Sequence, residues 1–368
     1  MAEGHARHTP YEIWMEKESL PVIRGYGVSD LQNVELGSWD RLGGKGAFID
    51  LVGMEKLTGM YIAEIPPGGE LKPERHMYEE FIYIDSGTGM AEVWQEGGPA
   101  RDLLWKAGSL FSPPLNSWHR LKNTGSETVR LVGVSVAPII MDFFHNEDFI
   151  FNCPFGFTDR YDGGSDYFVP ASQRTFLEED NRWLWQTNLV PDVRDLPIDS
   201  LEVKGSGVQI TVLELAGNVL GSHLSEWPAG RYHKAHYHAG GAILLILKGT
   251  GYSLIWPKDA GTRPWAEGRG DQVVRIDWQV GSLYSPPDGW FHQHFNTGPE
   301  PARQLAFRYG SLKNLMGWEL IRKGGQRSGT MVSLREGGTV VEYALEDPEI
   351  HRLFEEALAK RGVACRMH

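Results

Sequence analysis

The sequence is poor in several features that would mark whole classes of protein. Cysteine occurs twice in 368 residues, at Cys153 and Cys365, and never as a Cys-x-x-Cys pair. A disulfide framework is therefore excluded, and free thiols of a reducing compartment are expected. No apolar run reaches the ~20 residues that a membrane-spanning helix needs, and the N-terminal segment has no apolar signal region. We therefore expect a cytoplasmic protein that does not interact with membranes.

Positive charge is also scarce. Lys and Arg number 36 against 48 Asp and Glu, which gives a formal net charge of −12. Without a broad basic face the chain has little with which to neutralise phosphates, so a nucleic-acid partner is not expected. A small substrate is not excluded, because the local charge of a pocket can oppose the global sign.

Glycine and proline, by contrast, are plentiful and spread along the chain, with 44 Gly and 21 Pro. They separate short alternating or apolar stretches such as "GMYIAEI", "EFIYIDS", "AILLIL" and "GYSLIW". This spacing is typical of antiparallel sandwiches and barrels, so the sequence predicts an all-β protein. Few helices are indicated, the clearest being 345–362, whose acidic, proline-containing start and amphipathic face are typical of a docking helix.

An internal repeat organises the chain. Adding 162 to residue numbers aligns "PPGGELKPERHMYEEFIYIDSGTGMAEVW" (66–94) with "PAGRYHKAHYHAGGAILLILKGTGYSLIW" (228–256) without a gap. Adding 173 aligns "GSLFSPPLNSWHRLKNTG" (108–125) with "GSLYSPPDGWFHQHFNTG" (281–298). We therefore predict two tandem copies of one unit. The expected organisation is an arm (1–50), a first barrel (51–140), a connection (141–200), a second barrel (201–315) and an extension with a helix (316–368).

Both copies resemble the cupin superfamily, and the tandem arrangement resembles a bicupin. In the second copy Gly230 is followed after five residues by His236-x-His238, and Gly281 leads through "PPDGWFH" to His292. The resemblance implies two jelly-roll barrels, each around a central pocket. It also implies that His236, His238 and His292 are metal ligands.

Strand geometry is consistent with this ligand set. Residues i and i+2 of a strand project to one face, so His236 and His238 would both enter the barrel. His292, on a separate strand, would complete three imidazoles on one side of a metal. Imidazole suits Fe(II), Zn, Cu and Ni; we expect Fe(II), with Mn, Zn, Ni or Cu as alternatives. Ala242 stands where the superfamily motif has Glu, and this three-His variant resembles the gentisate- and salicylate-type ring-cleaving dioxygenases.

The first copy departs from the motif differently. Glu74 replaces the first His, while His76, Glu80 and His119 stand at their motif positions. These four residues are a possible second metal site. The alternative is a structural barrel whose pocket is filled by a hydrogen-bond network between Glu and His side chains.

Several further residues near the motifs are candidates for a role. His294 has the strand parity of His292 and is predicted to act in the pocket, and Tyr237, between two ligands, is a candidate catalytic or pocket-lining residue. His233 is expected at a rim or turn. Alternation places Leu305 and Phe307 on the inward face, so Arg308 is expected to point away from the pocket. Trp290 and Phe291 either line an aromatic pocket or pack structurally.

The resemblance implies a metal-dependent dioxygenase that cleaves a C–C bond of a small, anionic, hydroxylated aromatic or enolic acid, with dioxygen as co-substrate. Two alternatives stay open: an oxygen-independent isomerase, lyase or decarboxylase, and a non-catalytic bicupin that binds a small ligand. Exposed strand edges favour a homo-oligomer.

Overall fold

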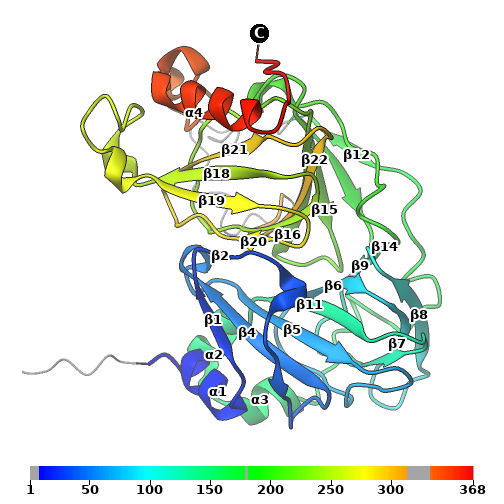
Figure 1. Cartoon of the computed structure of the whole chain (residues 1–368). Coiled ribbons are helices and arrows are strands. Elements are labelled where there is room, and N and C mark those ends of the chain that lie inside the picture. Colours follow the sequence, from blue (N-terminus) through cyan, green and yellow to red (C-terminus); the bar gives the residue numbers. More distant parts are fainter. Residues whose placement is uncertain (1–7, 179–180, 313–331, 368) are drawn as a thin grey trace, which may run out of the picture.

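The chain forms two β-barrels that lie one above the other (Figure 1). The computed structural model describes residues 8–178, 181–312 and 332–367. The prediction of an all-β protein with two tandem barrels and a C-terminal helix is confirmed. Residues 22–25, 37–38 and 45–51, expected in an N-terminal arm, supply strands of the first barrel's large sheet. No helix in these ranges is long and apolar enough to cross a bilayer.

The first barrel pairs a large sheet with a small one. The large sheet has the order β1-β4-β5-β11-β6-β9-β14, with β3 paired to β4, and the small sheet has the order β10-β7-β8. The bounds of these strands are β1 Val22–Gly25, β3 Gly37–Ser38, β4 Lys45–Leu51, β5 Gly59–Ile65, β6 Glu80–Ser86, β7 Thr88–Trp94, β8 Arg101–Lys106, β9 Leu110–Phe111, β10 Trp118–Asn123, β11 Val129–Ser135 and β14 Leu189–Val190.

The second barrel repeats this plan. Its large sheet has the order β12-β13-β15-β16-β22-β17-β20-β2, and its small sheet has the order β19-β18-β21. The bounds are β2 Gly27–Val28, β12 Thr175–Leu177, β13 Arg182–Gln186, β15 Gln209–Glu214, β16 Leu220–Trp227, β17 Ile243–Lys248, β18 Gly251–Trp256, β19 Val274–Trp278, β20 Leu283–Tyr284, β21 Phe291–Asn296 and β22 Ala302–Tyr309.

The two barrels exchange short strands at equivalent edges. Strand β2 of the N-terminal arm pairs with β20 of the second barrel, and β14 of the connection pairs with β9 of the first. Strands β9 and β20 are related by the sequence repeat, so the same edge of each barrel is covered by a strand from outside it. Covering an edge in this way satisfies its backbone groups and removes a site of aggregation.

The repeated asparagines have the same structural role in both copies. The Asn123 side chain donates to the carbonyls of Ile65 and Glu127 at 2.9 and 2.7 Å and accepts from the Gly125 amide at 2.9 Å. Asn296 likewise donates to two backbone carbonyls at 3.3 and 2.8 Å and accepts from a glycine amide at 3.0 Å. The asparagine of each repeat therefore closes the turn that follows strand β10 in the first barrel and strand β21 in the second.

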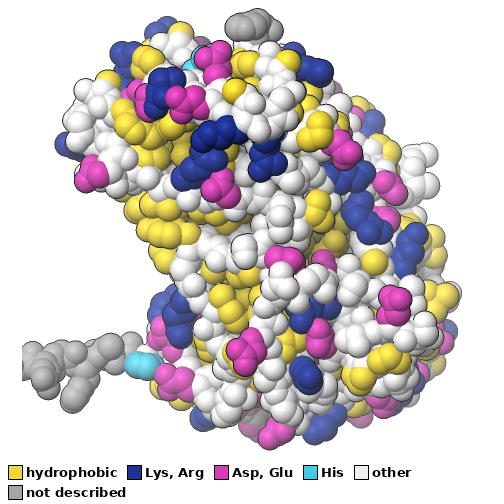
Figure 2. Space-filling model, viewed as in Figure 1, with side chains coloured by type: hydrophobic (Ala, Val, Ile, Leu, Met, Phe, Trp, Pro, Cys, Tyr) yellow, Lys and Arg dark blue, Asp and Glu magenta, His cyan; other side chains and the backbone are white. Residues whose placement is uncertain are grey.

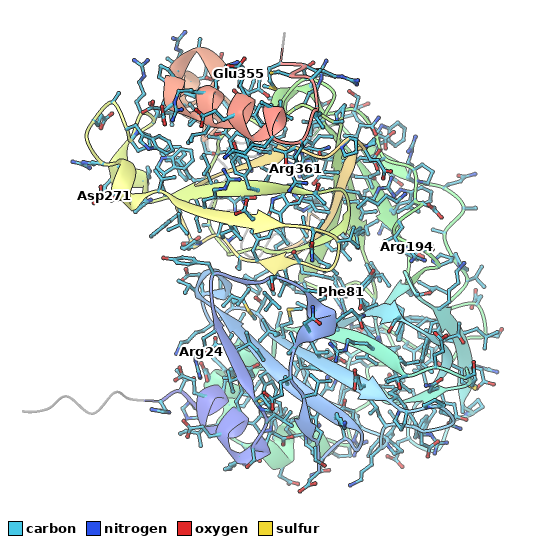
Figure 3. All side chains as sticks on the ribbon, in the orientation of Figure 1. Arg24, Phe81, Arg194, Asp271, Glu355 and Arg361 are labelled. Carbon is cyan, nitrogen blue, oxygen red and sulfur yellow. The ribbon has the colours of Figure 1, made fainter. Side chains whose placement is uncertain are left out.

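A shared apolar core joins the two barrels. One cluster of buried side chains runs from the first barrel into strands β16, β17, β20 and β22 of the second. Phe81 lies at this boundary (Figure 3), with its ring 6.3 Å from that of Phe307. Glu79 adds hydrogen bonds between the barrels. Its carboxylate accepts from the amides of Val219 and Leu220 at 2.6 and 3.0 Å and also pairs with Arg160. The barrels are therefore packed as one body.

Four helices occur in the described ranges. The predicted C-terminal helix is observed as α4 (Pro348–Ala359), and it buries Ile350, Phe354 and Leu358 against the second barrel. Helices α1 (Pro10–Glu18), α2 (Ala137–Phe144) and α3 (Glu147–Asn152) lie beside the first barrel and were not predicted (Figure 1). The start of α1 is fixed by a capping box between Thr9 and Glu12.

The surface carries both signs of charge. On the face in Figure 2, Lys and Arg side chains are interspersed with Asp and Glu, and hydrophobic side chains gather at the notch between the two lobes. No single-sign field dominates this face.

Candidate metal centre

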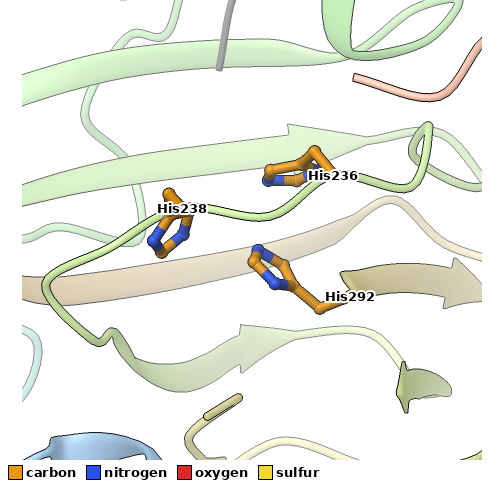
Figure 4. A group of neighbouring side chains, drawn as sticks. All are labelled: His236, His238 and His292. Atoms are coloured by element: carbon orange, nitrogen blue, oxygen red, sulfur yellow. The ribbon is translucent and has the colours of Figure 1, made fainter. Parts of the chain in front are cut away.

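His236, His238 and His292 converge inside the second barrel (Figure 4). His292 lies on β21, and the segment that carries His236 and His238 runs beside it before β17 begins. The backbones of His236 and His292 are joined by reciprocal hydrogen bonds of 3.1 and 2.9 Å. One nitrogen of each ring lies within 4.8 Å of those of the other two. The two segments therefore hold the three imidazoles by main-chain pairing.

The hydrogen bonds of the three rings orient them as metal ligands. The Nδ1 atoms of His236, His238 and His292 face backbone carbonyls at 3.0, 3.3 and 3.1 Å. An imidazole that donates from Nδ1 to a carbonyl has an unprotonated Nε2, which is the arrangement commonly found in metal-binding histidines. The residues therefore fit a divalent metal ion.

Electrostatics keep these imidazoles neutral. Burial lowers the pKa of His292 to about 3. Burial and the nearby Lys204 also lower the pKa of His236 well below its ordinary value, and burial and His292 do the same for His238. Neutral imidazole is the form that binds metals, so no proton has to be displaced near pH 7.

The donor set contains no carboxylate. Ala242, which replaces the first-copy Glu80, lines the cavity, and no Asp or Glu is among the described residues around it. A metal on three neutral nitrogens would retain its full charge and attract an anionic ligand.

The three histidines open into a small polar cavity inside the second barrel. Three of its lining residues are apolar: Ile210, Ala242 and Leu244. The others are polar or basic: Arg182, Lys204, His223, Ser225, His233, His236, His238, His292, His294, Gln304 and Arg308. A cavity of this composition suits a small, oxygen-rich anion better than an aromatic ring.

His294 lines this cavity behind the three ligands. Trp278 Nε1 donates to Ser253 Oγ at 3.1 Å, and His294 Nδ1 lies 2.9 Å from Ser253 Oγ and 3.0 Å from the Tyr284 hydroxyl. These two hydroxyls fix the orientation of the imidazole, because each can donate to Nδ1 or accept from it. His294 is therefore a polar wall residue of the cavity with a fixed ring orientation.

Three expectations about residues near the motifs were wrong. Arg308 lines the cavity, because Leu305 and Phe307 pack against the first barrel and the opposite face of β22 is the inward one. His233 is not at a rim: it is buried and also lines the cavity. Tyr237 does not line it, because alternation turns its ring outward onto Phe291, at 5.2 Å between centroids. A catalytic role for Tyr237 is therefore not supported.

Trp290 and Phe291 do not line the cavity either. Phe291 belongs to the apolar cluster beneath α4, and Trp290 lies 6.3 Å from the Tyr26 ring of the N-terminal arm. Both serve packing.

Sequence reasoning missed Lys204, Arg182 and His223. Lys204 ends a 3-10 turn (Glu202–Lys204) before β15, whereas Arg182 begins β13 and His223 lies within β16. None is near a motif in sequence. The segment that carries His223 was not among the predicted strands, so its inward parity could not be read from the sequence.

The first barrel holds a second cluster at the equivalent position. His76 Nε2 lies 3.5 Å from Glu80 Oε2, and His119 Nε2 lies 3.7 Å from Glu74 Oε1 and 3.9 Å from Glu80 Oε2. Both Nε2 atoms and Glu80 Oε2 are buried without a hydrogen-bond partner. Glu74, His76 and His119 each place one ligand atom within 4.8 Å of the other two, and Glu80 lies beside them, so this cluster is a second candidate metal site. A network of contacts between Glu and His side chains stays open as the alternative.

Arg41 distinguishes this first cluster from the second. Its guanidinium pairs with Glu74 Oε2 at 2.6 Å and also with Glu18. Burial opposes ionisation of Glu74, but Arg41 and His119 outweigh it and lower the pKa of that carboxyl group. Glu74 is therefore ionised and shared between Arg41 and the cluster.

Comparison with known proteins agrees with this architecture. Residues 61–136 match the model of the Cupin domain. The match covers strands β5 to β11 of the first barrel, and the second barrel repeats the fold of the first. Auxin-binding protein 1 of Arabidopsis thaliana is 29% identical over 140 residues, which are 36% of this chain and 67% of that protein.

Solved structures of oxalate decarboxylase are also similar. A Bacillus subtilis variant aligns at a TM-score of 0.49 with 14% identity, over 78% of each chain. The Lactobacillus farciminis enzyme in complex with formate aligns at 0.49 with 13% identity, over 78% of this chain and 86% of that one.

Proposed function

We propose that the second barrel binds a divalent metal ion on His236, His238 and His292 and acts on a small organic acid without consuming oxygen, as a lyase or decarboxylase. The observation that carries this proposal is the set of ring nitrogens. Each Nδ1 faces a backbone carbonyl at 3.0 to 3.3 Å, which leaves three neutral Nε2 atoms directed into one cavity.

The composition of the cavity favours this reaction over cleavage of an aromatic ring. An aromatic substrate needs apolar or aromatic walls, but Tyr237, Trp290 and Phe291 all lie outside the cavity. Basic and neutral hydrogen-bonding groups surround the ligands instead. Such groups suit a substrate with several oxygens and few carbons.

The residues of the cavity have distinct roles in this proposal. A bound divalent ion supplies a Lewis acid that polarises a carboxylate or carbonyl oxygen. When carbon dioxide or another group leaves such an acid, negative charge accumulates on the remaining oxygens. His294 and Lys204 line the same cavity and, as hydrogen-bond donors, would stabilise that charge.

The donor set favours a second candidate, an Fe(II) dioxygenase acting on an enolic acid. Ala242 in place of Glu leaves three protein ligands, so substrate could occupy two positions and dioxygen a third. Oxygen dependence separates this reaction from the first.

The test begins with elemental analysis of protein purified without an affinity tag. We expect His236→Ala to lose the metal of the second barrel, whereas His145→Ala, which removes an exposed imidazole beside α2, keeps it. Unchanged metal content in His236→Ala would contradict the proposal.

Turnover is then measured with and without oxygen. Protein loaded with Mn²⁺ or Fe²⁺ is incubated with oxalate, malonate and oxaloacetate, and carbon dioxide release is followed under argon. Release under argon supports the lyase, and oxygen uptake coupled to substrate loss supports the dioxygenase. Binding of an acid without turnover by either route would indicate a bicupin that only binds a ligand.

A further inference from the structure

Three buried polar groups on the wall of the second-barrel cavity have no hydrogen-bond or ion-pair partner among the residues that the structure describes. Lys204, Ser225 and His233 are only 4%, 1% and 2% exposed. Ser225 Oγ and His233 Nε2 form no hydrogen bond, and the Lys204 ammonium has no hydrogen bond or ion pair with any described residue. All three line the cavity that the metal-ligand histidines enter.

The backbone holds these groups in place. The carbonyl of Lys204 accepts from the Lys234 amide at 2.8 Å, and the His233 amide donates to the carbonyl of His294 at 3.0 Å. Ser225 lies in β16, where its neighbour Leu224 packs toward the first barrel, so Ser225 faces inward. The positions of the three groups therefore follow from main-chain pairing and do not depend on contacts among their side chains.

A buried polar group without a partner is costly, at about 1–3 kcal/mol for an uncharged one and more for a charge. Three such groups around one small cavity are therefore expected to have a ligand as their partner. An ammonium, a hydroxyl and an imidazole N–H are all donors, and together they match the oxygens of an anion. Burial, followed by Arg182 and Arg308, lowers the pKa of Lys204, and a bound anion would favour its charged form.

We propose that Lys204, Ser225 and His233 form a carboxylate-binding subsite beside the metal ligands, so that the substrate is a small dicarboxylic acid. One carboxylate approaches the three histidines, and the other is held by this subsite. The inference rests on the proposed function and adds the class of substrate to it.

The probes are malonate and malonamate, which differ in one carboxylate replaced by a neutral amide. Binding to Mn²⁺-loaded protein is measured by titration calorimetry, and the metal content of every sample is determined. Since a hydrogen bond to a charged group contributes about 10- to 100-fold in affinity, we expect Lys204→Met to weaken malonate binding by that factor and to leave malonamate binding nearly unchanged. Lys248→Met, which removes an exposed lysine of the same barrel, should change neither affinity.

Ser225→Ala provides a second variant with little risk to folding. We expect it to weaken malonate binding by about 3- to 10-fold. If Lys204→Met and Ser225→Ala bind malonate as tightly as the wild type, or if the wild type does not prefer malonate to malonamate, the subsite is refuted. Metal content distinguishes the two proposals. If only the subsite is wrong, the wild type still contains metal in the second barrel. If the proposed metal centre is wrong, the wild type contains no metal there.

Discussion

Glu346 should make the stability of this protein depend on pH in an unusual direction. Its carboxyl group is buried beside the ligand strand, where it accepts from the Tyr232 hydroxyl and, at 3.0 Å, from Gln293 Nε2. Gln293 lies between His292 and His294, so this contact joins the segment before α4 to the candidate metal centre. Burial raises the pKa of Glu346 to about 7.

The magnitude follows from linkage. The folded state binds this proton more tightly than the unfolded chain, whose carboxyl group has an ordinary pKa of 4.5. The contribution of Glu346 to the free energy of unfolding is therefore greatest below pH 4.5, falls as the pH rises to about 7, and is lower by about 3 kcal/mol above that. Glu346→Gln imitates the protonated form. Its amide can donate to the Tyr232 oxygen while its carbonyl still accepts from Gln293.

The assay is urea-induced unfolding followed by tryptophan fluorescence at pH 5 and pH 8. We expect the stability of Glu346→Gln to exceed that of the wild type by less than about 1 kcal/mol at pH 5 and by about 3 kcal/mol at pH 8. Glu300→Gln, at an exposed position, should follow the wild type at both. Equal stability of the wild type and Glu346→Gln at pH 8 would refute the reasoning.

Three further predictions concern the barrels themselves. Gly53→Ala should destabilise the protein by about 1–3 kcal/mol, because the new Cβ would lie 2.2 Å from the carbonyl oxygen of Pro286 in the other barrel; an unchanged melting temperature would contradict the close packing. Phe307→Ala should cost about 3–5 kcal/mol in urea unfolding, since it empties the fully buried boundary between the barrels, and a loss below about 1 kcal/mol would argue against that boundary. His119→Ala should remove the metal of the first barrel but leave that on His236, and elemental analysis that finds no loss would refute the second centre.

The two-barrel architecture could be predicted because the same pattern of strands, turns and motif residues occurs twice in the sequence. The spacing of His236 and His238 puts them on one face of an extended segment, and the motif brings His292 to the facing strand. Each of these relations is local or repeated, and the structure brings the three rings together as expected.

Arg308 was misplaced because alternation identifies two faces of a strand but not which one is inside. In β22 the more apolar face, with Leu305 and Phe307, packs against the other barrel. A strand shared between two barrels is buried on both sides, so hydrophobicity cannot select the cavity face.

Lys204 lay beyond sequence reasoning for a different reason. It lies in a short turn, and its place in the cavity depends on a tertiary hydrogen bond to Lys234. The exchanged strands β2 and β14 are equally difficult, because each has two residues and pairs with an edge far away in sequence. The capping box of α1, in contrast, was a readable signal that was overlooked.

The most direct test of the central claim is an anomalous-scattering difference map from crystals of metal-loaded protein, recorded at the absorption edge of the bound metal. We expect a peak inside the second barrel, about 2.0–2.2 Å from the Nε2 atoms of His236, His238 and His292. A map with no peak between these three rings, in protein shown to contain metal, would contradict it.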